Sequence, residues 1–235
     1  MFKRISVTCL AGLFVSTLSA SAATFTFATA SGATAGGEAV SASATVTTNA
    51  NGTVSVTLND LLANPMDVGQ LISDFDFTLS NGATSGTLTS SSGTTIFIGS
   101  GGTTTPGTTG STGWGVNNNV NGGIQLDALG FVGPAGLIIG PGPYTNANSS
   151  IAGNGPHNPF ILDTATFTLL VSGVTDTTSV TSATFSFGTT PGVNVPGVPG
   201  NPPPPIPEPA SIALFGTGMA GLAAMLRRRF HMPTA

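Results

Sequence analysis

The chain has almost no cysteine, and its fold must do without disulfide bonds. Of its 235 residues one is cysteine, Cys9, which lies in an apolar N-terminal segment that we expect to be removed. The mature protein then offers no thiolate as a nucleophile or a metal ligand. Its stability must come from packing and backbone hydrogen bonds.

Basic side chains are also scarce, and all five lie near the two ends, at Lys3, Arg4 and Arg227–Arg229. Residues 24–207 therefore contain no lysine or arginine. The same span has eight acidic residues, so its net charge is about −8 (no bases, eight acids). Without a basic patch the protein cannot neutralise phosphates, and we expect no nucleic-acid binding.

Residues suited to catalysis are few. The body has one histidine, His157, in a loop rich in proline and glycine, and one glutamate, Glu38. We find no Gly-x-Ser-x-Gly elbow, EF-hand, P-loop or nicotinamide-binding pattern. We therefore expect a protein that is not an enzyme and has no cofactor. A hydrolase that uses His157, Asp74 or Asp76 is the less favoured alternative.

The N-terminus has the pattern of a secretory signal peptide. Lys3 and Arg4 precede an apolar stretch at 5–18, and small residues follow. This stretch is too short for a lasting membrane span. We predict a signal peptide over residues 1–23, with cleavage by signal peptidase at Ala22 or Ala23.

The middle of the chain has the two-residue period of half-buried β-strands. Polar and apolar residues alternate strictly in Thr53–Leu58, and the preceding Asn49–Gly52 is typical of a hairpin turn. Residues 74–79, 166–169 and 184–187 alternate in the same way, and no segment keeps a helical period. We predict an all-β domain over 24–188, an antiparallel two-sheet β-sandwich with the jelly roll as one strand order.

Other segments are less regular. Further strands are predicted at 84–90, 94–98, 123–128 and 136–140. Residues 99–122 and 141–159, rich in glycine, proline and asparagine, are predicted to be long loops. Residues 189–206 are predicted to form an extended Pro/Gly-rich stalk.

Two pairs of residues are candidates for ligand contacts in the body. Alternation places Asp74 and Asp76 on the face opposite Phe75 and Phe77. There they are either solvated strand charges that deter aggregation, which we favour, or part of a Ca²⁺ site. Trp114 and Tyr144 are the only residues of their types and lie in the predicted loops, where they either stack on a sugar or pack inside.

The C-terminus combines three signals. Pro207, Glu208 and Pro209 precede an apolar run, Ala210–Leu226, which the basic cluster Arg227–Arg229 follows. As a helix the run would be about 25 Å long, the short end of the range for a membrane span. We predict a transmembrane helix at 210–226, with Arg227, Arg228 and Arg229 marking its cytoplasmic side and 230–235 as a cytoplasmic tail.

This order of signals resembles the PEP-CTERM sorting signal of Gram-negative bacteria. The resemblance covers about residues 205–230, with the signal itself at 207–229. It implies that the exported protein stays in the inner membrane until an exosortase-like protease acts near Pro207–Pro209. The product would then reach the cell surface or the extracellular matrix. The alternative is an ordinary membrane anchor on a proline-rich stalk.

From these signals we expect an exported structural protein of the cell surface or extracellular matrix. Its expected partners are signal peptidase, an exosortase-like membrane protease and extracellular polysaccharide. The alternative is a carbohydrate-binding or adhesive surface module, for which Trp114 and Tyr144 are the candidate ligand contacts.

Overall fold

The computed structural model describes residues 22–200 and Met219. The chain divides into two compact units, with the boundary in the sequence after residue 201, and residues 22–200 belong to the first. The secondary structure of this part is almost entirely β, as the alternating sequence predicts. It also has three short 3-10 helices, η1 (Val68–Gln70), η2 (Ser100–Gly102) and η3 (Gly155–His157).

The strands, in chain order, are β1 (Ala22–Ala28), β2 (Thr34–Ala35), β3 (Glu38–Ala39), β4 (Ala42–Asn49), β5 (Thr53–Asp60), β6 (Ile72–Leu79), β7 (Thr87–Ile98), β8 (Thr104–Gly110), β9 (Gly115–Val120), β10 (Gly123–Asp127), β11 (Ile138–Ile139), β12 (Phe160–Leu170), β13 (Val180–Phe187), β14 (Asn194–Pro196) and β15 (Val198–Pro199).

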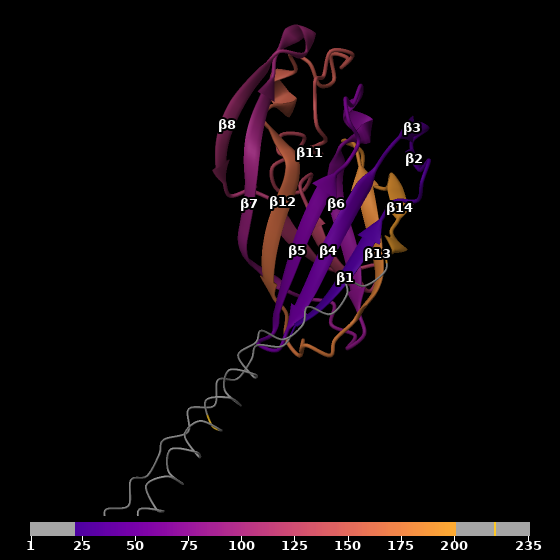
Figure 1. Ribbon diagram of the computed structural model, residues 1–235, viewed down its shortest axis with the longest axis vertical. Helices are drawn as coiled ribbons and strands as arrows, with labels where there is room; N and C mark the ends of the chain where they lie inside the picture. Colours follow the sequence, from indigo (N-terminus) through magenta and orange to yellow (C-terminus); the bar gives the residue numbers. More distant parts are fainter. Residues whose placement is uncertain (1–21, 201–218, 220–235) are drawn as a thin grey trace, which may run out of the picture. The chain divides into compact units, whose positions relative to one another are not determined.

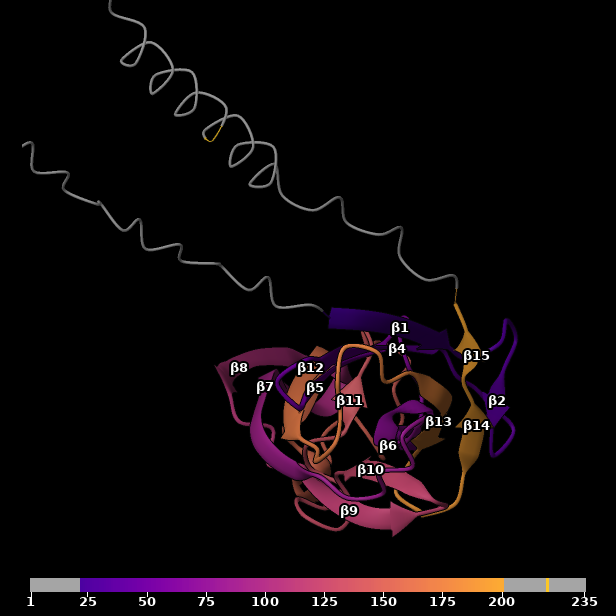
Figure 2. The same cartoon turned by 90° about the horizontal axis from the view of Figure 1, so that it is seen from below.

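Thirteen of these strands form one curled sheet, and β2 and β3 pair separately. One run of neighbours is β8-β7-β12-β5-β4-β1-β15, and the other is β9-β10-β6-β13-β14. Strand β11 joins the runs because it pairs in parallel with β12 and antiparallel with β6. Figures 1 and 2 show the two runs on opposite sides of the fold, with β11 between them. The antiparallel all-β class is confirmed, but two separate sheets are not.

The hairpin of β4 and β5 is the clearest agreement with the sequence. Every second side chain of both strands is buried, and Val54, Val56 and Leu58 are at most 1% exposed. The turn residue Gly52 has a φ of +82°, which is the conformation expected in an Asn-Gly turn. This hairpin supplies one wall of the core.

Phenylalanines from both runs fill that core. Phe75 of β6 lies against Phe77 of the same strand, with 6.0 Å between the ring centroids, and against Phe185 of β13 at 5.2 Å. Phe167 of β12 packs on Trp114 at the same centroid distance. The alternation that places aromatic residues inward in β6 also determines which side chains face outward, and that face carries the site described below.

Two predicted irregular segments contain strands. Residues 99–122, predicted as a loop, include β8 and β9, and the predicted stalk from 189 includes β14 and β15. The loop at 141–159 holds only η3 and no strand. Strand β8 was missed because both of its faces are largely exposed, so its residues have no apolar alternation. Val195 of β14 is buried opposite Phe185, and the folded unit therefore extends beyond the predicted boundary at 188.

Several terminal predictions fall outside the described residues. These are the signal peptide up to residue 21, the motif Pro207–Pro209, the basic cluster Arg227–Arg229 and, apart from Met219, the predicted transmembrane helix. In residues 22–200 and at Met219 no helix has the length and apolarity needed to cross a membrane. The predicted cleavage residues Ala22 and Ala23 begin β1, where they pair with Asn49 and Thr48 of β4.

Candidate functional site

An acidic pocket lies on the outward face of the run β9-β10-β6-β13-β14. The strand register builds it as two ranks of side chains across neighbouring strands. Asp127 of β10 is directly opposite Asp74 of β6, which is opposite Ser186 of β13 on its other side. One step along, Gln125 is opposite Asp76. Since side chains two residues apart share a face, both ranks point away from the phenylalanine core.

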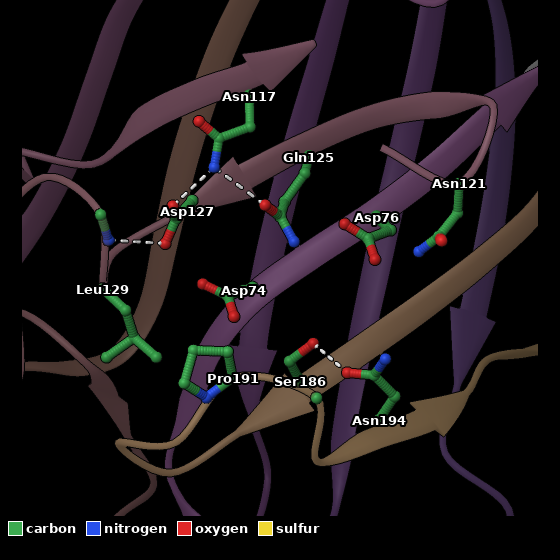
Figure 3. Close-up of a pocket in the computed structure, with 12 residues that line it drawn as sticks. Asp74, Asp76, Asn117, Asn121, Gln125, Asp127, Leu129, Ser186, Pro191 and Asn194 are labelled. Carbon is green, nitrogen blue, oxygen red and sulfur yellow. Dashed lines mark hydrogen bonds between the residues drawn. The ribbon is translucent and has the colours of Figure 1, made fainter. Parts of the chain in front are cut away.

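The pocket has a volume of about 410 Å³, and polar side chains line it together with Leu129, Pro191 and two glycines. Figure 3 shows the carboxyl groups of Asp74, Asp76 and Asp127 converging on it, with Asn194 and Pro191 along one side. Asn121, in the turn between β9 and β10, lies at the end next to Asp76.

Hydrogen bonds fix one wall of the pocket. The Asn117 side-chain amide donates to Asp127 Oδ2 at 2.7 Å and to Gln125 Oε1 at 3.0 Å. The Gly130 N–H donates to Asp127 Oδ1 at 3.0 Å. On the opposite side Ser186 donates to Asn194 Oδ1 at 2.7 Å. Asp127 is thus held as a hydrogen-bond acceptor at both oxygens.

Asp74 is the unusual group of the pocket. It is 5% exposed, and its Oδ1 has no hydrogen-bond partner. Burial raises its pKa to about 8, and contact with the carboxylate of Asp127 and the charge of Asp76 add to the effect, while Ser73 opposes it. A carboxyl group with this pKa is mostly protonated at neutral pH. Asp74 can therefore share its proton with Asp127, in place of a repulsion between two opposed charges.

Asp76 is 8% exposed, and burial raises its pKa, although hydrogen bonds from Gln125 and Asn121 oppose this shift. The favoured expectation of solvated strand charges is therefore wrong for both aspartates. The face was predicted correctly, but residues of β9, β10 and the loop before β14 surround the two aspartates there. Of these segments, β10 was predicted as a strand at 123–128, whereas β9 and the loop before β14 fall in the predicted loop and stalk.

The alternative expectation was a Ca²⁺ site at Asp74 and Asp76. Among residues 22–200 and Met219, no group of three or more His, Cys, Asp or Glu side chains is placed to hold a metal ion. Asp74, Asp76 and Asp127 therefore do not form such a group. The pocket is better described as a proton-sharing carboxyl pair with amide neighbours, which can donate and accept hydrogen bonds and repels anions.

The two predicted aromatic contacts lie inside the protein. Trp114 is 4% exposed, packs on Phe167 and donates from Nε1 to the Gly136 carbonyl oxygen at 2.8 Å. Tyr144 is 1% exposed and donates to the Gly140 carbonyl oxygen at 2.8 Å. Neither ring presents a face to solvent, so the structure gives no support to stacking on a sugar.

His157 lies apart from the acidic pocket. It ends η3, and its Nδ1 is 2.7 Å from the Ser150 carbonyl oxygen. Sequence reasoning missed Asp127, Asn117 and Gln125 as members of the pocket. A signal did exist for two of them, because Gln125 and Asp127 alternate with Ile124 and Leu126 as the aspartates of β6 alternate with its phenylalanines.

Comparison with protein families matches residues 205–229 to the PEP-CTERM protein-sorting motif. This segment carries the PEP-CTERM sorting signal. The match agrees with the resemblance seen in the sequence and is confined to the C-terminal end. No curated protein and no solved structure matches the chain significantly. The PEP-CTERM signal indicates an exosortase substrate that is exported and processed at the membrane.

Proposed function

We propose that this protein is a non-enzymatic structural component of the cell surface or extracellular matrix, released there after processing at its PEP-CTERM signal. The observation that carries the proposal is the sorting motif at residues 205–229. An exosortase-like protease acts on the chain near Glu208, and the folded unit is the product.

The charge distribution supports release from the membrane. All lysines and arginines lie at 3–4 and 227–229, outside the folded unit. Once both ends are removed the product is acidic and has no basic group to hold it on an anionic lipid surface. Such a protein is suited to the solvent or the matrix.

The edge strands of the curled sheet support a domain that does not pair with other chains through its edges. Strands β8, β9, β14 and β15 lie at its margins, and all but β9 contain a proline, namely Pro106, Pro196 and Pro199. Proline cannot donate a ladder hydrogen bond, so it hinders pairing with another chain. The predicted alternative, a carbohydrate-binding module, depended on Trp114 and Tyr144, which are both buried.

The test replaces Glu208 with alanine and follows the chain by immunoblotting of membrane, surface and medium fractions. We expect Glu208→Ala to accumulate as a full-length membrane form, because the protease no longer recognises its motif. Pro203→Ala, which lies in the proline run just before the matched segment, is the control and should be processed normally. Normal release of Glu208→Ala would contradict the proposal.

A further inference from the structure

Three side-chain oxygens without a hydrogen-bond partner belong to the region around the end of β5. They are Asp60 Oδ2, Asn64 Oδ1 and Asp163 Oδ1, and all three are buried atoms. Asp60 ends β5, Asn64 follows four residues later, and Asp163 precedes Thr164 of β12, which pairs with Asn59. A buried acceptor without a donor costs about 1–3 kcal/mol, so three in one region need an explanation.

Backbone donors hold the carboxylate of Asp60 and leave one of its oxygens without a hydrogen bond. Its side chain is 1% exposed, and the Leu62 N–H donates to Oδ1 at 3.0 Å. A backbone hydrogen bond from Gly140 also reaches this carboxylate. Gly140 packs so closely that a Cβ there would collide with the Leu62 carbonyl oxygen. The carboxylate is thus held by two backbone donors, and Oδ2 is without one.

Neighbouring donors are already used elsewhere. The Tyr144 hydroxyl donates to the Gly140 carbonyl oxygen at 2.8 Å, and the Asn64 N–H donates to the Pro141 carbonyl oxygen at 2.7 Å. Thr164 Oγ1 donates to Asn59 Oδ1 at 2.8 Å. Residues 22–200 contain no lysine or arginine. This part of the chain therefore supplies no lysine or arginine side chain to these oxygens.

The backbone at two of the three residues is in an uncommon conformation. Asn64 has a φ of +54° and Asp163 a φ of +59°, in the left-handed region that asparagine and aspartate tolerate. Asp163 also lies where the register of β12 shifts against β7, between Ile161 and Ala165. Such irregularities redirect side chains and occur often beside ligand sites.

We propose that Asp60, Asn64 and Asp163 bind a divalent cation of the Ca²⁺ class. The donor set consists only of oxygens, from two carboxylates and an amide, which are ligands that Ca²⁺ prefers. Backbone carbonyl oxygens and water complete its usual six to eight ligands. With two acidic ligands and one amide, this group differs from the three-acid clusters that are absent from the described residues.

Electrostatics and access agree with this assignment. Burial raises the pKa of Asp60 well above its usual range, the charge of Asp163 contributes, and burial also raises the pKa of Asp163. A bound cation would offset this penalty. Asp163 lines an open depression of about 380 Å³ together with Tyr144, Pro141 and Leu162, so the proposed site borders this depression at Asp163.

Calorimetric titration of the full chain in detergent, after treatment with EDTA, tests the proposal. We expect one Ca²⁺ per chain with a Kd of about 10⁻⁴–10⁻³ M, the range of extracellular modules. Asp163→Asn should weaken binding about tenfold or more, because it removes a charged ligand. Asp176→Asn is the matched control, and Asp74→Asn excludes the acidic pocket as the binding site; both should bind as the wild type does.

Tyr144 gives a second, optical measurement, since it is the only tyrosine and the charges of Asp60 and Asp163 act on it. A Tb³⁺ ion at the site should show sensitised emission, which Ca²⁺ displaces. Tyr144→Phe should reduce this emission while Ca²⁺ still raises the unfolding temperature. Emission that Tyr144→Phe and Asp163→Asn leave unchanged would place the ion elsewhere and overturn the assignment.

The alternative to a bound cation is that the buried carboxyl group of Asp60 is protonated. An unfolding temperature equal in Ca²⁺ and in EDTA, with Asp60→Asn at least as stable as the wild type, would show this and overturn the proposal. Tighter binding of Mg²⁺ than of Ca²⁺ would contradict the assigned class of ion. If Asp60→Asn does not fold, the half-buried Asp163→Asn variant decides the test.

Discussion

At the scale of single residues, the same alternation has two outcomes in β6. Phe75 and Phe77 enter the core as the sequence predicts, and Asp74 and Asp76 face the other way. A sequence pattern states which face a side chain is on, but not what later covers that face. The burial of Asp74 depends on Asp127, which is more than fifty residues away in the chain and directly opposite in the sheet.

The raised pKa of Asp74 predicts how stability depends on pH. Its folded value of about 8 exceeds its ordinary value of 3.8, so the folded protein binds this proton more tightly than the unfolded chain does. The group therefore favours folding less as pH rises from about 4 to about 8, by at most about 1.4 kcal/mol per unit. In urea unfolding, Asp74→Asn should lose less stability than the wild type between about pH 5 and about pH 8.

The control for this experiment is Asp176→Asn, which removes an aspartate outside the pocket and should follow the wild-type pH dependence. Asp60, Asp76 and Asp163 also have raised pKa values and act in the same direction. Only the difference between Asp74→Asn and the wild type is assigned to Asp74. Parallel pH curves for these two proteins would contradict the account of the carboxyl pair.

At the scale of elements, the sequence predicts strands that bury one face and misses those that do not. The hairpin of β4 and β5 was predicted together with its turn, because Val54, Val56 and Leu58 alternate with polar residues. Strand β8 has no buried face and forms by pairing with β7, as in the Thr94–Thr109 hydroxyl contact of 2.7 Å. Long-range pairing of this kind leaves no local pattern, which is why β9 at the margin of the acidic pocket was not predicted.

Close approach of β10 to β6 is needed to build the pocket, and Gly123 permits it. A Cβ at Gly123 would collide with the Phe77 carbonyl oxygen, whereas a Cβ at Gly110 of β8 would meet nothing within 4 Å. We expect Gly123→Ala to lower the free energy of unfolding by about 1–3 kcal/mol, measured in urea with Trp114 fluorescence.

Gly110→Ala is the matched control, since it makes the same substitution in a strand where space is free. It should be neutral, or stabilise the fold by up to about 1 kcal/mol through the unfolded chain. Equal effects of the two variants would show that the contact with Phe77 does not limit the packing of β10.

At the scale of the whole molecule, the distribution of charge connects the fold to the sorting signal. The folded unit has acidic groups and no lysine or arginine, and the five basic residues lie in the terminal segments that the proposed processing would remove. Under this proposal the Arg227–Arg229 cluster belongs to the precursor and not to the product. The folded unit also has buried carboxylates without lysine or arginine partners. A bound cation would offset the electrostatic cost of burying them.

The most direct test of this account is the intact mass of the protein released by cells that process PEP-CTERM substrates. We predict a form that begins near Ala22 or Ala23, ends before Arg227 and contains no lysine or arginine, so trypsin should not cleave it. A released protein that retains residues 227–229, or a chain found only as the full-length membrane form, would contradict the account.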